Sequence, residues 1–77
     1  MNKYLISYDI SNAKNYNKVK DLFLSLLERY GIIQDNSVES TLILNSSYSE
    51  SDLSMGIIGI SYIIKKRTGA SITCALK

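Results

Sequence analysis

The stretch Lys3-Tyr4-Leu5-Ile6-Ser7-Tyr8-Asp9-Ile10 determines how this chain begins to fold. Its residues alternate, with Tyr4, Ile6, Tyr8 and Ile10 pointing to one side and Leu5, Ser7 and Asp9 pointing to the other. A period of two, in a segment rich in aromatic and β-branched residues, predicts a β-strand over residues 3–10. A polar connection over residues 11–14 follows, so we expect Asp9 to lie where the strand ends.

An amphipathic helix is expected next. Apolar residues recur at spacings of three and four, at Val19, Leu22, Phe23, Leu26, Leu27 and Tyr30. These spacings place them on one face of a helix. Asn15 is the expected N-cap, and Gly31 is the expected left-handed terminator.

A second helix is expected over residues 51–67. Ser49 and Asp52 have the spacing of a capping box, and Leu53, Ile57, Ile60 and Ile64 follow at helical intervals. The isoleucines and glycines of this segment would also suit a strand, but a run this long without an internal turn signal favours a helix. Gly69 is expected to end it.

The remaining segments complete an α+β pattern. Ile32 and Ile33 begin a short strand that residues 34–36 interrupt, residues 37–44 form a strand, residues 45–51 a turn, and residues 70–76 a last strand. This order predicts a ferredoxin-like split βαβ sandwich, in which a four-stranded antiparallel sheet carries two helices on one face. We expect residues 1–77 to form this single domain.

Composition excludes several classes of site. The chain has 77 residues, no histidine and one cysteine, so it has no Ser-His-Asp triad, no internal disulfide and no cysteine and histidine zinc site. Cys74 lies in an apolar stretch, which predicts a buried residue in a reducing, cytoplasmic environment. The longest apolar run, residues 55–64, is shorter than the roughly 20 residues that span a bilayer, so we expect no membrane contact.

Basic residues gather in two places, although the net charge is only +2. Lys14 and Lys18 lie around the first helix, and Lys65, Lys66 and Arg67 form a run at the end of the second. Both groups are candidates for contacts with nucleic-acid phosphates. The alternative is that they are solvated helix ends, and for the second group this alternative is favoured because cations there oppose the helix dipole.

Asp9 is the candidate catalytic and metal-binding residue. One carboxylate holds part of a magnesium (Mg²⁺) shell, so a complete site would need a second copy of the chain. The alternative is that Asp9 accepts backbone N–H bonds from the turn at residues 11–13. Ser7 and Tyr8 are the candidate supporting residues, Ser7 on the same face and Tyr8 as a stacking surface, although a tyrosine at strand spacing is more often part of the core.

Two segments carry a family resemblance. Residues 3–10, quoted above, and Asn36-Ser37-Val38-Glu39-Ser40-Thr41-Leu42-Ile43 resemble the small CRISPR adaptation subunit often written Cas two. They are most similar to short bacterial Cas-two-like proteins of the SinR family, and VapD toxins are related. The resemblance implies a ferredoxin-like homodimer and, for some members, magnesium-dependent cleavage of RNA or DNA by paired aspartates that correspond to Asp9. Other members hold nucleic acid or protein partners without cleavage.

Two hypotheses follow. The first is a homodimeric interaction module for nucleic acid or protein, set in a defence, mobile-element or phage context, with no cofactor. The second is a magnesium-dependent endonuclease in which Asp9 from each chain holds the metal and Lys14 and Lys18 approach phosphates. The weak net charge and the single carboxylate favour the first.

Overall fold

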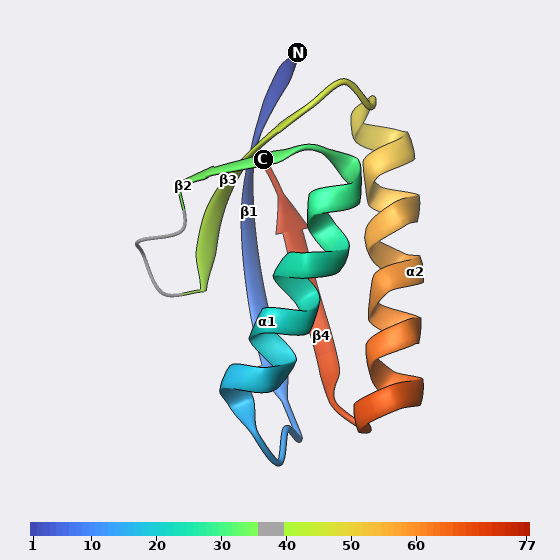
Figure 1. The fold of residues 1–77 in the computed structure, drawn as a ribbon. Coiled ribbons are helices and arrows are strands. Elements are labelled where there is room, and N and C mark those ends of the chain that lie inside the picture. Colours follow the sequence, from blue (N-terminus) through green and yellow to red (C-terminus); the bar gives the residue numbers. More distant parts are fainter. Residues whose placement is uncertain (36–39) are drawn as a thin grey trace.

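The computed structural model describes residues 1–35 and 40–77, and its elements follow the predicted order (Figure 1). They are β1 (Asn2–Ser11), α1 (Tyr16–Leu27), a 3₁₀ turn (Glu28–Tyr30), β2 (Ile32–Asp35), β3 (Thr41–Ser46), α2 (Glu50–Thr68) and β4 (Ser71–Leu76). The strands form one antiparallel sheet in the order β2-β3-β1-β4. Both helices cover the same face of the sheet (Figure 1), so the predicted ferredoxin-like α+β fold is confirmed.

Strand β1 lies inside the sheet, where it pairs with β3 on one side and β4 on the other. Tyr4, Ile6 and Tyr8 are buried beneath the helices. Leu5 and Asp9 lie on the opposite side of the sheet, which we call the open face. Because a slip by one residue would expose the whole apolar set, this alternation holds the register of β1.

The core lies between the sheet and the two helices. Its helical residues are those of the predicted apolar faces, Val19, Phe23, Leu26 and Leu27 from α1 and Leu53, Ile57, Ile60 and Ile64 from α2. Phe23 is fully buried, and its ring centroid lies 5.1 Å from that of Tyr8. The contact between Phe23 and Tyr8 joins α1 to β1, so the core depends on it.

Capping residues define the helix ends that the sequence predicts. Asn15 Oδ1 accepts a hydrogen bond from the Lys18 backbone N–H at 3.2 Å, and Ser49 Oγ accepts one from the Asp52 N–H at 3.2 Å. These bonds satisfy donors that have no partner inside the helix. Gly69 ends α2 in the left-handed conformation, with φ of 79°. These three predicted caps are therefore confirmed, and α2 extends one residue beyond the predicted range of 51–67 at each end.

Helix α2 is charged at both ends. Glu50 and Asp52 lie in its first turn, and Lys65, Lys66 and Arg67 lie in its last. Acidic residues at the start and basic residues at the end both oppose the helix dipole and stabilise the helix. Neither α2 nor any other helix in the described ranges combines the length and the apolar character needed to cross a membrane.

The end of α1 differs from the prediction. The helix ends at Leu27, a 3₁₀ turn follows, and Gly31 has an extended backbone with φ of 165°, so the predicted left-handed terminator is wrong. Glycine is needed here for another reason. A Cβ built on Gly31 would lie 2.1 Å from the carbonyl oxygen of Asn45 in β3. The chain thus enters β2 through a backbone approach that leaves no room for a side chain.

The end of β3 also differs from the prediction. The predicted turn over residues 45–51 is wrong at its start, because β3 continues through Ser46. Ser46 is fully buried, its Oγ donates to the carbonyl oxygen of Tyr30, and the same Oγ accepts a bond from the Tyr48 N–H at 3.1 Å. A polar residue that looks like part of a turn is therefore a buried link between β3 and the end of the 3₁₀ turn.

Strand β2 is short and irregular. It runs through Asp35 with a register shift between Ile33 and Asp35, so the predicted interruption at residues 34–36 begins inside the strand. Residues 36–39, which include part of the predicted strand over residues 37–44, lie outside the described residues. In the described part, the strand begins at Thr41.

Candidate nucleic-acid interface

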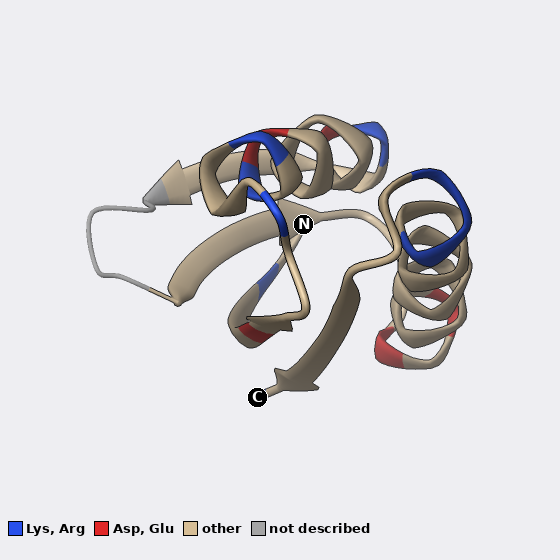
Figure 2. Cartoon of the chain, turned by 90° about the horizontal axis from the view of Figure 1, so that it is seen from below, with Lys and Arg blue, Asp and Glu red and all other residues tan. Residues whose placement is uncertain are grey.

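The fold brings both groups of basic residues to one end of the molecule. Lys14 and Lys18 flank the start of α1, and Lys65, Lys66 and Arg67 lie in the last turn of α2. Because β1 and β3 are antiparallel, the helices that follow them also run in opposite directions, so α1 starts where α2 ends (Figure 1). Viewed from that end, both helices show basic residues (Figure 2). We call these five residues the basic end.

All five side chains of the basic end are exposed, and none forms an ion pair within the described ranges. Lys65 Nζ donates to the Gly69 carbonyl oxygen at 3.3 Å and to Ser71 Oγ at 3.4 Å, which ties it to the end of α2. Lys66 Nζ lies 6.0 Å from the centroid of the Tyr62 ring. Exposed cations without a carboxylate partner create a positive potential that attracts phosphate groups.

Asp9 lies within β1, two residues before the last residue of the strand, Ser11, so the predicted strand end at residue 10 is wrong by one residue. It pairs with Thr73 in the ladder with β4, and that ladder continues to Ser11. The chain turns at Asn12, which has φ of 60°, a conformation that asparagine tolerates. The Asp9 side chain is exposed on the open face, and its carboxylate accepts no hydrogen bond from the described residues, including the turn at residues 11–13.

The two supporting residues lie on opposite sides of the sheet. Ser7 is on the open face with Asp9, half-buried between Thr41 of β3 and Ala75 of β4. Tyr8 is 4% exposed and belongs to the core. Tyr8 therefore supports the fold beneath the sheet and offers no surface on which a base could stack.

In the described part of the chain, few oxygen ligands surround Asp9 on the open face. Magnesium in proteins commonly takes one or two carboxylates together with several waters. Among the described side chains, Asp9 is the single acid on the open face, and its neighbours Ser7 and Thr73 add hydroxyl groups alone. The described residues contain no group of three or more His, Cys, Asp or Glu suited to a metal. Within the described residues of one protomer, Asp9 therefore supplies one carboxylate, and no second acid joins it.

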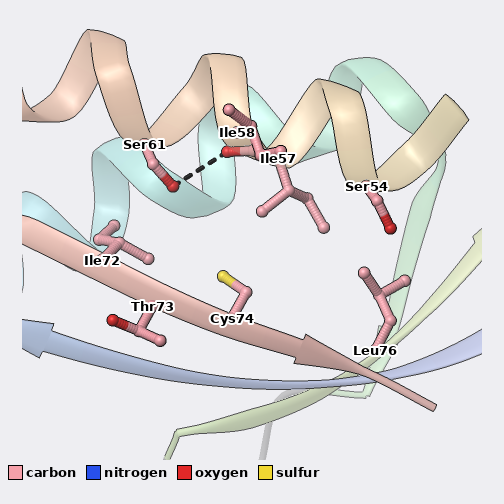
Figure 3. A pocket seen from close by; sticks show the side chains of 8 residues that line it. All are labelled: Ser54, Ile57, Ile58, Ser61, Ile72, Thr73, Cys74 and Leu76. Atoms are coloured by element: carbon pink, nitrogen blue, oxygen red, sulfur yellow. Dashed lines mark hydrogen bonds between the residues drawn. The ribbon is translucent and has the colours of Figure 1, made fainter. Parts of the chain in front are cut away.

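Sequence reasoning missed a groove between α2 and the edge strand β4 (Figure 3). It has a volume of about 400 Å³, and its lining includes Ser54, Ile58 and Ser61 from α2 and Ile72, Cys74 and Leu76 from β4. Burial raises the pKa of the Cys74 thiol to about 11, so at neutral pH this thiol stays protonated and serves as apolar lining. A signal was present in the sequence, because Ile58, which lines the groove, forms a second apolar stripe on α2 with Met55 and Tyr62.

The described residues thus provide three surfaces. The basic end gathers five cations from two helices, the open face carries Asp9 and Ser7, and the groove lies beside β4. No family model, curated protein or solved structure matches the chain.

Proposed function

We propose that this protein is a nucleic-acid-binding module, a homodimer of the Cas-two-like kind that holds RNA or DNA at its basic end and does not cleave it. The observation that carries the proposal is the meeting of two cationic groups, far apart in the sequence, at one end of the fold. The resemblance of the first strand to Cas-two-like proteins supports the same class of function and a defence, mobile-element or phage setting.

The chemistry of the basic end favours contacts with the phosphate backbone. Lysine and arginine bind phosphates as charges and release counterions, which contributes affinity without reading the base sequence. Lys14, Lys18 and Arg67 make no hydrogen bond through their side chains to other described residues, so their charges are available. Lys65 is already hydrogen-bonded at the helix end and is expected to contribute least.

A triple substitution tests the proposal. We expect Lys14→Gln, Lys66→Gln and Arg67→Gln together to weaken binding of a labelled single strand by about 100-fold at about 50 mM salt. The slope of log K against log salt concentration should fall by about 2, because three phosphate contacts are lost and each contributes about 0.7 for a single strand. Fluorescence anisotropy over a salt series measures both quantities, with RNA and DNA strands of the same sequence.

The chain offers a matched control. Lys3→Gln, Arg29→Gln and Lys77→Gln also remove two lysines and one arginine, so net charge changes equally, but these exposed residues lie away from the basic end. We expect the control triple to keep nearly the full affinity and salt slope. Equal weakening by both triples would show that net charge alone determines binding, and the proposal would then fail.

The second candidate is a magnesium-dependent endonuclease that pairs Asp9 across a dimer, and the exposure of Asp9 on the open face supports it. For the non-catalytic module, we expect labelled RNA and DNA to stay intact with wild-type protein and magnesium. Asp9→Asn should bind as tightly as wild type, or slightly more tightly because a negative charge is removed. Gel electrophoresis of the labelled strands checks this. Cleavage that needs magnesium and disappears in Asp9→Asn would instead establish the nuclease.

A further inference from the structure

The outer edge of β4 has unused hydrogen-bonding capacity. Leu5 and Lys77 exchange both backbone bonds, at 3.1 and 2.9 Å, which sets the alternation of the ladder between β1 and β4. In an antiparallel pair such residues alternate with residues whose N–H and C=O groups point away. The backbone groups of Ile72, Cys74 and Leu76 therefore point outward, and no described strand covers them.

An apolar surface lies on α2, and one of its residues, Ile58, lines the groove beside this edge. Met55, Ile58 and Tyr62 form a stripe along α2, and they are 68%, 69% and 67% exposed. Figure 3 shows Ile57 pointing from α2 toward β4 in the middle of the groove, with Ile58 above it beside the helix, Ser61 and Ile72 at one end, and Ser54 and Leu76 at the other. Large exposed apolar side chains beside an unpaired strand are typical of a protein interface.

The surface complements itself. Glu50 lies in the first turn of α2 and Lys65 in the last, and Ile58 lies midway between them. Lys65 points toward β4, because it bonds to Ser71 Oγ at 3.4 Å. When two such helices meet in opposite directions at Ile58, the acidic start of each lies opposite the basic end of the other. Opposite charges meeting in this way favour one orientation over others.

We infer that β4 and α2 form a two-fold interface with a second copy of this chain. The two β4 strands pair antiparallel around Cys74, which brings the outward groups of Ile72 opposite those of Leu76 and joins the sheets into one of eight strands. The α2 helices pack through the stripe of Met55, Ile58 and Tyr62, and Glu50 faces the partner's Lys65. A two-fold interface of this kind uses the same patch on both copies.

This assembly determines how far apart the two Asp9 residues lie. Two β4 strands separate the β1 strands of the two copies, and neighbouring strands are about 4.8 Å apart. The two Asp9 residues then lie about 14 Å apart or more, too far to share one magnesium ion. The interface rests on the homodimer of the proposed function and specifies which surfaces form it, whereas binding to nucleic acid is measured separately and can fail while the dimer persists.

The interface is tested by substituting two exposed isoleucines, Ile58 and Ile32, and measuring the mass of each variant in solution by light scattering. Wild type should have twice the 8.6 kDa mass of the chain. Ile58→Lys should weaken dimerisation by about 100-fold or more, because two lysines would be buried at the centre of the interface. Ile32→Lys is the matched control, since Ile32 is 62% exposed but lies on β2, and it should remain dimeric. A monomeric wild type, a dimeric Ile58→Lys, or a dimer broken by Ile32→Lys instead would overturn the inference.

Amide exchange followed by NMR tests the strand pairing. In the wild-type dimer, the N–H groups of Ile72, Cys74 and Leu76 should exchange about 100-fold more slowly than in Ile58→Lys, whereas Thr73 and Ala75 should be protected in both. Equal exchange of the first three amides in both proteins would exclude pairing through β4. Tyr62→Glu, at another exposed position of the stripe, replaces Ile58→Lys if that variant does not fold.

Discussion

Replacing Gly31 with alanine is expected to destabilise the protein by about 3 kcal/mol or more. The added Cβ would meet the carbonyl oxygen of Asn45 at 2.1 Å and its carbonyl carbon at 2.9 Å, and both are backbone atoms of β3. Backbone atoms cannot relieve the clash by changing rotamer, as a side chain can. Strand β2 would therefore have to move away from β3 and lose backbone hydrogen bonds between the two strands. Urea unfolding followed by circular dichroism measures the change in the free energy of unfolding.

Gly59→Ala is the control for this prediction. Gly59 lies inside α2, and a Cβ built there meets no atom within 4 Å. Alanine has a higher helix propensity than glycine, so this variant should be more stable by about 0.5–1 kcal/mol. The same substitution should therefore have opposite effects at the two positions. A Gly31→Ala protein as stable as wild type would contradict the close approach of β2 and β3.

Phe23→Ala is expected to cost about 3–5 kcal/mol, because it removes a fully buried ring from the core. Stability of about 0.05–0.15 kcal/mol per residue would give a chain of this size about 4–12 kcal/mol in all. The variant should therefore lose much of its stability, and its melting temperature should fall by at least about 15 °C. Thermal unfolding followed by circular dichroism is the measurement.

Leu5→Ala provides the comparison for Phe23→Ala. Leu5 is a large apolar residue like Phe23, but it lies in β1 on the open face of the sheet, where it is 39% exposed. Its truncation leaves no closed cavity, so we expect a loss of about 1 kcal/mol or less. If the two variants melted at the same temperature, the core would not lie between the sheet and the helices as described.

Local patterns were sufficient for most of the fold. The alternation in β1, the helical spacing before Leu27, and the caps at Asn15, Ser49 and Gly69 each depend on residues close together in the chain. Gly31 was misassigned because its requirement comes from Asn45, and nothing near Gly31 in the sequence indicates that contact. Local chemistry therefore predicts the elements, whereas contacts between strands determine where some of them end.

The candidate sites also depend partly on local sequence patterns and partly on contacts between elements. The sequence identifies the cations of the basic end, but only the opposite directions of α1 and α2 bring Lys18 and Lys66 to one end of the molecule. The face of Asp9 follows from alternation, but its distance from the strand end depends on pairing with β4. The groove does not follow from the sequence, because it exists only where β4 packs beside α2, and the core face of a helix is the face that its periodicity predicts.

The composition of β4 has a consequence for how the protein behaves when it is concentrated. Ser71–Leu76 contains no charged residue and no proline, the features that commonly stop exposed strands from joining other chains. The two-fold contact inferred above would use this edge on both copies at once, so no β4 edge would remain for a third copy. A variant that folds but does not dimerise would keep the edge of β4 unpaired. It should precipitate or polymerise at a lower concentration than wild type.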